Sequence, residues 1–194
     1  GISRPQMGAI LKEHKTRGAE VMIVLDVSNS MLAEDYSPNR LERAKLAISR
    51  MVDKLREDRI GLIVFAGNSF VQLPITTDYV SAKMFLNSIS TESVPIQGTA
   101  IGDAISTALR SFSAQSDKSR AIIVITDGEN HEDDPVAAAS QAAELGVRVF
   151  AIGVGSPAGK MIPLEGDYLR DKEGTPAPLA IETSGHAALK ENYF

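Results

Sequence analysis

The feature that most constrains the fold is a short apolar run, residues 21–25, that stops at Asp26. A continuous apolar run of this length, followed at once by polar residues, is typical of a strand buried on both faces of a parallel sheet. Asp26, Ser28 and Ser30 alternate along the loop that follows, so three oxygen side chains can converge on one point beyond the strand. Open α/β sheets bind ligands at this end of their strands. An all-oxygen cluster suits a hard divalent cation.

Further apolar runs predict more strands. Residues 59–66, 121–126 and 147–153 are predicted to be buried strands, and residues 69–73 a short edge strand that forms a hairpin with the first of these. Helical patterns lie between the runs. The alternation predicts an α/β fold: a doubly wound, mostly parallel, Rossmann-like sheet with one short antiparallel edge strand and helices on both faces.

Four helices are predicted from apolar spacing and end signals. The first occupies residues 37–57, with Ser37 as its cap and a proline in its first turn. The second follows possible caps at residues 76–78 and is predicted to turn Val80, Met84, Phe85 and Ile89 inward. The third carries Thr99 at its N-terminus. The fourth begins at Asp134-Pro135 and ends at Gly146.

Length and composition favour one well-packed domain. The 194 residues are 43% hydrophobic, which is enough for one core and short for two. We expect a lead-in at 1–19 and a single domain at 20–194, with its core at 20–155 and a C-terminal hairpin or tail at 156–194. The formal net charge of -5 lacks the basic excess of a nucleic-acid-binding protein. With no cysteine, disulfides and thiolate sites are excluded, and no apolar run is long enough to span a membrane.

The residues that follow the strands carry a family resemblance. The segments Asp26-Val27-Ser28-Asn29-Ser30, Gly98-Thr99 and Thr126-Asp127-Gly128 resemble the three parts of the metal-ion-dependent adhesion site of von Willebrand factor A (VWA) domains. The resemblance covers roughly residues 20–155. Each part lies at the predicted end of a strand or start of a helix, which makes the match specific.

The resemblance implies a role for each matching position. Ser28 and Ser30 give hydroxyl oxygens to the cation, and Thr99 becomes a direct ligand when a partner is bound. Asp26 and Asp127 then act mainly through water or through hydrogen bonds to the serines. Neutral hydroxyl ligands leave the cation much of its charge, so that an acidic side chain of a partner protein can complete the shell. Mg²⁺ is the expected ion, and Mn²⁺ or Ca²⁺ can substitute.

Other interpretations compete with this one. Asp26 and the two serines also fit simple turn formation. The acidic run 129–134 is either a second cation site or a solvated loop whose acids favour the next helix N-terminus. The chain also resembles magnesium-dependent phosphohydrolases of the haloacid dehalogenase type, in which Asp26 would be the nucleophile. That family needs a second acid two residues later, and this chain has Ser28 there. We therefore expect no enzyme. The glycine-rich stretch 153–159 lacks the following helix of a dinucleotide loop.

Within the VWA family the chain most resembles the bacterial Bat-type aerotolerance proteins. The resemblance rests on residues 25–31, 40–45, 58–66 and 126–130, together with the start at residues 3–6. It implies a domain anchored at the inner membrane of the bacterial envelope, on the periplasmic side, that docks protein partners. A MoxR-type AAA+ ATPase or other Bat-type proteins are the expected partners. A VWA subunit of a metal chelatase is the alternative, and it would bring an ATPase domain or a long acidic, proline-rich linker.

Overall fold

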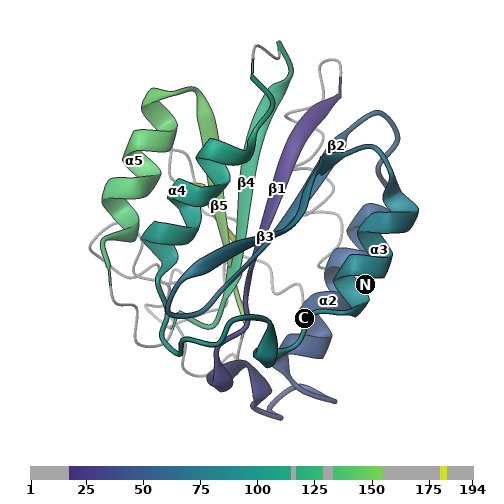
Figure 1. The fold of residues 1–194 in the computed structure, drawn as a ribbon, viewed down its shortest axis with the longest axis vertical. Coiled ribbons are helices and arrows are strands. Elements are labelled where there is room, and N and C mark those ends of the chain that lie inside the picture. Colours follow the sequence, from purple (N-terminus) through teal and green to yellow (C-terminus); the bar gives the residue numbers. More distant parts are fainter. Residues whose placement is uncertain (1–17, 115–116, 129–132, 155–179, 183–194) are drawn as a thin grey trace, which may run out of the picture.

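The computed structural model describes residues 18–114, 117–128, 133–154 and 180–182, and Figure 1 shows their arrangement. One sheet has the strand order β3-β2-β1-β4-β5-β6. The strands are β1 (Ala19–Asp26), β2 (Arg59–Phe65), β3 (Ser69–Thr76), β4 (Ser119–Thr126), β5 (Val147–Gly153) and β6 (Ala180–Glu182). The helices are α2 (Arg40–Val52), α3 (Tyr79–Asn87), α4 (Ile101–Ser111) and α5 (Pro135–Glu144), with short 3-10 helices η1 (Asn29–Leu32) and η2 (Thr91–Ser93).

The pairing of the strands confirms the predicted fold class. Strand β1 pairs in parallel with β2 and β4, and β4 pairs in parallel with β5. Strand β3 pairs antiparallel with β2 as the predicted hairpin, but it runs on to Thr76 instead of ending at Leu73. Pro74 is tolerated inside it because an edge strand leaves one side unpaired. A second antiparallel edge strand, β6, was not predicted.

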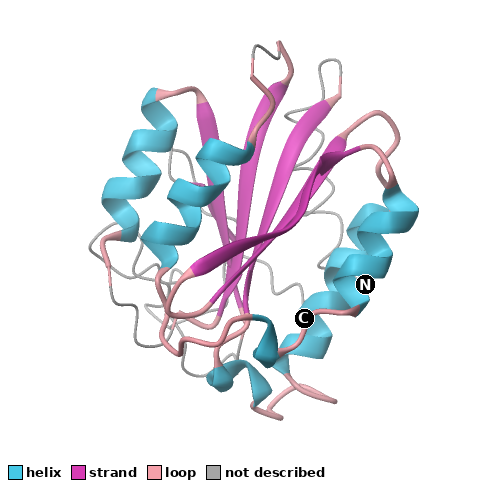
Figure 2. Ribbon diagram, in the orientation of Figure 1, coloured by secondary structure: helices cyan, strands magenta, loops and turns pink. Residues whose placement is uncertain are grey.

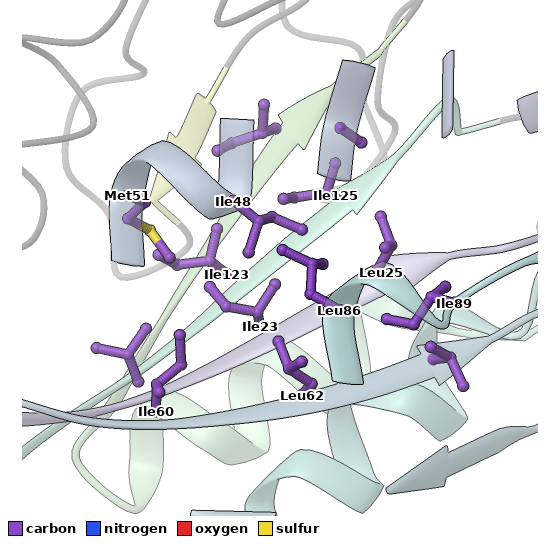
Figure 3. Packing of buried hydrophobic residues seen from close by; sticks show 14 of the residues in the cluster. Ile23, Leu25, Ile48, Met51, Ile60, Leu62, Leu86, Ile89, Ile123 and Ile125 are labelled. Carbon is purple, nitrogen blue, oxygen red and sulfur yellow. The ribbon is translucent and has the colours of Figure 1, made fainter. Parts of the chain in front are cut away.

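Helices cover both faces of the sheet, as Figure 2 shows. Alternate residues of β1 divide between two cores. Val21, Ile23 and Leu25 lie in the core beneath α2 and α3, whereas Met22 and Val24 lie in the core beneath α4 and α5. Residues 21–25 of β1 and 121–125 of β4 are therefore apolar at every position, which is why they appear as unbroken runs in the sequence. Figure 3 shows the first core, where Ile48 and Met51 of α2 and Leu86 of α3 pack on the strands.

The start of α2 differs from the prediction. The helix begins at Arg40, and its cap is Asn39, whose side chain accepts a hydrogen bond from the backbone N–H of Glu42. Ser37 and Pro38 precede the cap. The helix starts here because the backbone N–H of Arg40 donates to the carbonyl of Ala33 at 2.9 Å, which closes the loop between η1 and α2.

The buried face of α3 was also predicted wrongly. Asp78 is its cap, as expected, and Ile89 is buried just beyond its end. Val80, Met84 and Phe85 are 79%, 64% and 41% exposed, and the helix instead buries Ala82 and Leu86. In this short helix, apolar side chains occur on more than one side, so their spacing does not decide which side faces the sheet.

Other predicted boundaries are close to the observed ones. Asp134 caps α5 with Pro135 in its first turn, and Gly146 follows its end at φ +76°. The predicted lead-in and C-terminal tail lie outside the described residues except for residues 18–19 and 180–182, as does the glycine-rich stretch from residue 155 on, so the domain limits stay a prediction. No helix in the described part is long and apolar enough to cross a membrane.

Candidate metal centre

The side chain of Asp26 is fully buried at the carboxyl end of β1 and organises the loop beyond it. Its Oδ1 atom accepts a hydrogen bond from the backbone N–H of Ser28 at 2.8 Å and another from the Ser28 hydroxyl at 2.6 Å. An aspartate that binds the backbone two residues ahead forms a tight local turn. This turn fixes both the backbone and the hydroxyl of Ser28.

The two serine hydroxyls face each other across this turn, with Ser28 Oγ and Ser30 Oγ 3.0 Å apart. Because the Ser28 hydroxyl donates its proton to Asp26, its lone pairs remain to accept a hydrogen bond from Ser30 or to bind a cation. Ser30 belongs to η1, which in Figure 1 lies at the lower edge of the sheet, where the parallel strands end. The chain thus presents two neutral oxygens at the mouth of β1.

The end of β4 brings in the second carboxylate, Asp127, and Thr126, which belongs to the sequence motif but was given no role of its own in the predicted site. The hydroxyl of Thr126 donates to Asp26 Oδ2 at 2.6 Å and accepts from the backbone N–H of Gly128 at 3.0 Å. It therefore ties the ends of the two central strands together. Asp127 follows and is buried, with 1% exposure. The positive φ of Gly128, +71°, lets the chain turn away directly after it.

The loop before α4 brings Thr99 to the same edge of the sheet. Its backbone is held by hydrogen bonds from Gly67 N–H to the Ile96 carbonyl and from Ala100 N–H to the Ala66 carbonyl. The loop passes so close to Gly67 that a Cβ there would lie 2.6 Å from Ile96 Cγ2. Thr99 itself is buried. Within the described residues its side chain makes no direct hydrogen bond to Asp26 or the serines.

The electrostatics of the site are those of two buried acids beside one guanidinium. Burial, together with the nearby charge of Asp127, raises the pKa of Asp26 from 3.8 to about 7, although its hydrogen bonds from Ser28 and Thr126 oppose the rise. Arg40 of α2 donates from Nη1 to Asp127 Oδ2 at 3.2 Å. It also donates from Nε and Nη2 to the two carboxylate oxygens of Asp35, at 2.9 and 3.0 Å.

Arg40 was absent from the predicted site. An arginine in the first turn of an amphipathic helix usually points into solvent, so nothing in its local sequence marked it. Its guanidinium joins residues that are far apart in the chain. Only the packing of α2 against the ends of β1 and β4 makes it part of the site.

The donor set fits a small, hard divalent cation. Among the described residues, no three His, Cys, Asp or Glu side chains gather into a group that could hold a metal. A cation here would therefore depend on the hydroxyls of Ser28, Ser30 and Thr99, with Asp26 and Asp127 supplying negative charge behind them. Oxygen donors of this kind match Mg²⁺, Mn²⁺ or Ca²⁺ and do not favour soft metals.

The acidic run after β4 has a structural role where it is described. Asp133 accepts hydrogen bonds from the backbone N–H groups of Gly102 and Asp103, both at 2.8 Å, and so caps α4. Asp134 caps α5 through the N–H of Ala137. Both contacts favour the prediction that these acids serve helix N-termini, although Asp133 caps a different helix from the expected one. Residues 129–132 and the histidines lie outside the described residues.

A doubly wound sheet with hydroxyls and buried carboxylates at the mouth of its first strand is the architecture of a VWA domain. The model of the von Willebrand factor type A domain family matches residues 21–129. A protein of Borreliella burgdorferi is 36% identical over 148 residues, covering 74% of this chain and 42% of that protein. A UPF0353 protein of Mycolicibacterium paratuberculosis is 32% identical over 180 residues, covering 84% and 50%. The chain belongs to the VWA family and spans about half the length of these relatives.

Solved structures place the chain more narrowly. It resembles the conserved protein BatB from Bacteroides thetaiotaomicron, with a TM-score of 0.71 and 59% identity over 85% of this chain and 80% of that one. An aerotolerance-related membrane protein from Bacteroides fragilis gives a TM-score of 0.70 and 56% identity over 85% and 81%. Proximal thread matrix protein 1 of the mussel byssus, solved with a zinc-occupied MIDAS motif, shares the fold at 24% identity, with a TM-score of 0.63 over 72% and 36%.

Proposed function

We propose that this VWA domain is a non-catalytic protein-binding module that captures an acidic side chain of a partner protein through a divalent cation, most simply Mg²⁺. The observation that carries the proposal is the hydrogen-bonded chain from Asp26 through Ser28 to Ser30. It leaves two neutral hydroxyl oxygens directed at a common point, backed by buried negative charge. A cation held mainly by hydroxyls keeps much of its charge for an incoming carboxylate.

The surroundings of Asp26 argue against its acting as a nucleophile. Both carboxylate oxygens already accept hydrogen bonds, from Ser28 and from Thr126, and the side chain is fully buried. An attacking carboxylate needs an exposed oxygen in line with the phosphorus atom, and this one is turned away from solvent. The geometry therefore favours a supporting role for Asp26 in ion binding over phosphoryl transfer.

The biological setting is part of the same proposal. The similarity to an aerotolerance-related membrane protein supports a domain that works at a bacterial membrane. We place it on the periplasmic side of the inner membrane and propose a MoxR-type AAA+ ATPase or another Bat-type protein as the partner. Such a partner would offer an aspartate or glutamate side chain to the cation.

The first test is calorimetric titration of Mg²⁺ and Mn²⁺ into protein that has been stripped of metal with EDTA. Wild-type protein should bind one ion, and Ser28→Ala should weaken binding about tenfold or more because it removes a direct oxygen donor. Ser111→Ala is the matched control, since among the described residues that hydroxyl bonds only to the Thr107 carbonyl within α4. Equal affinity in wild type and Ser28→Ala would refute the site.

The second test concerns the partner group. Synthetic peptides that carry glutamate are compared with the same peptides carrying glutamine, in Mg²⁺ and in EDTA. Association that requires both the carboxylate and the metal supports the proposal. Association that is unaffected by EDTA would contradict it and place the binding surface elsewhere on the domain.

A further inference from the structure

Arg40 is a buried cation next to the proposed metal site. Its side chain is 8% exposed although it begins a helix at the molecular surface. A charged side chain in such a place must be paired. Its pairs come from two directions: Asp35, in the loop after η1, takes two hydrogen bonds, and Asp127, at the end of β4, takes one.

The two acids hold the guanidinium unequally. The contacts with Asp35 are bidentate and shorter, at 2.9 and 3.0 Å, and the contact with Asp127 is longer, at 3.2 Å. A bidentate arginine–carboxylate pair is the stronger arrangement. Asp35 therefore holds the guanidinium in place and weakens the electrostatic interaction between Arg40 and Asp127.

We propose that Arg40 competes with the divalent cation for Asp127 and so sets the metal affinity of the site, while Asp35 opposes it by drawing the guanidinium away. This inference rests on the proposed function, because it requires a cation at Ser28 and Ser30. A fixed positive charge beside Asp127 repels an incoming divalent ion. It also neutralises part of the carboxylate charge, so that a bound ion is left more attractive to the partner's acid.

The proposal predicts opposite effects for the two residues. Arg40→Met removes the competing charge and should tighten Mg²⁺ binding about tenfold. Asp35→Asn frees the guanidinium for Asp127 and should weaken Mg²⁺ binding by about threefold or more. In the double variant Arg40→Met/Asp35→Asn, the change at Asp35 should not alter Mg²⁺ affinity further, because it acts through Arg40 and that guanidinium is absent. A purely structural role for this ion pair would weaken binding in both single variants.

Matched controls separate local charge from general effects on α2. Lys45→Met removes another largely buried cation of the same helix, one that donates to the carbonyls of Asn87 and Ile89 instead of the site. Asp53→Asn removes an exposed acid just after the helix, where it pairs with Lys83. Both should leave metal affinity within about twofold of wild type. The charge of Asp53 is exposed and screened by solvent, and the charge of Lys45 is balanced locally by Glu42 and the two carbonyls. Arg40→Lys keeps the charge and should stay closer to wild type than Arg40→Met.

The experiment is calorimetric titration of Mg²⁺ and Mn²⁺ into the metal-stripped 194-residue chain and its variants, with urea unfolding in EDTA to check that each variant is folded. Tighter binding in Arg40→Met together with weaker binding in Asp35→Asn supports the proposal. Equal affinities, or loss of affinity in both, overturn it even if wild-type protein binds metal. If wild type binds no metal but Arg40→Met does, competition by Arg40 stands and the proposed function fails. If neither binds, both are overturned. Should Arg40→Met fail to fold, Arg40→Gln takes its place, because it removes the same charge and keeps a polar side chain; tighter binding supports the proposal and weaker or equal binding overturns it.

Discussion

Replacing Asp26 by asparagine should stabilise the metal-free domain at neutral pH, even though Asp26 lies at the centre of the site. The carboxyl group is fully buried beside Asp127. Asparagine has the hydrogen-bonding pattern of the protonated acid: its carbonyl can accept from the N–H and hydroxyl of Ser28, and its amide can donate to the hydroxyl of Thr126. The variant therefore keeps the local turn and removes the buried charge.

The size and sign of the effect follow from the pKa of Asp26. Burial and the charge of Asp127 raise it from 3.8 to about 7 in the folded state. At about 1.4 kcal/mol per pKa unit, keeping the group ionised in the fold costs on the order of 4 kcal/mol. Below the unfolded-state pKa, Asp26 is protonated in both the folded and the unfolded state, so its burial as a charge costs no free energy of folding. Stability is lost as pH rises from about 4 to about 7 and then levels off.

The assay is urea unfolding in EDTA of wild type and Asp26→Asn between about pH 4 and about pH 8. The two proteins should have similar stability near the lower limit. At the upper limit the variant should be more stable by about 2–4 kcal/mol, the lower figure allowing for imperfect replacement of the hydrogen bonds. Excess Mg²⁺ should stabilise wild type and have little effect on the variant.

Asp78 provides a control of opposite sign. Its carboxylate caps α3, and the hydrogen bonds from Ser81 lower its pKa. The ionised Asp78 carboxylate stabilises the fold above the unfolded-state pKa, and this stabilisation is lost as pH falls. Asp78→Asn should therefore be less stable than wild type at neutral pH. A difference between wild type and Asp26→Asn that does not change with pH, or a variant less stable than wild type at about pH 8, would refute the electrostatic account of Asp26.

Three further outcomes are expected. Mg²⁺ binding by wild type should tighten about tenfold per pH unit up to about pH 7 and then level off, because the ion must displace the proton of Asp26. Calorimetry in two buffers of different ionisation enthalpy measures the released proton. A pH-independent affinity would count against this expectation. Asp133→Ala should lower the free energy of unfolding by about 1–2 kcal/mol, because it leaves two N–H groups at the start of α4 uncapped, and Asp134→Ala, which removes a single capping bond, should cost less in the same urea titration. Gly61→Ala should cost about 1–3 kcal/mol, since the added Cβ would lie 2.6 Å from the buried Met22 Sδ; an unchanged unfolding midpoint would show that Met22 has room to move.

Much of the site was predictable because its central part is local. Asp26, Ser28 and Ser30 lie within five residues of one another, so the turn that brings them together is formed by the chain itself. The apolar runs before Asp26 and Asp127 are likewise unbroken because both faces of these strands are buried. Two acids at the ends of parallel strands must then lie at the same edge of the sheet.

Features that depend on contacts distant in the chain were missed or misjudged. Arg40 meets Asp127 across 87 positions of sequence, and no local pattern records that pairing. The orientation of α3 was predicted from Val80 and Met84, yet the side that faces the sheet is set by how Ala82 and Leu86 fit against β2 and α2. Helix spacing defines faces, but packing decides which face is buried.

The sequence by itself determined strands β1 to β5, the order of these strands and the helices along the chain, and the hydroxyl and carboxylate groups beyond the end of β1, because these depend on residue type and on neighbours along the chain. Only the tertiary structure decided the charge balance around them. The raised pKa of Asp26 arises from burial and from Asp127, and the guanidinium of Arg40 reaches the site from a helix on one face of the sheet. Burial and Coulomb energy depend on distances in space, and those distances exist only once α2, β1 and β4 have packed together.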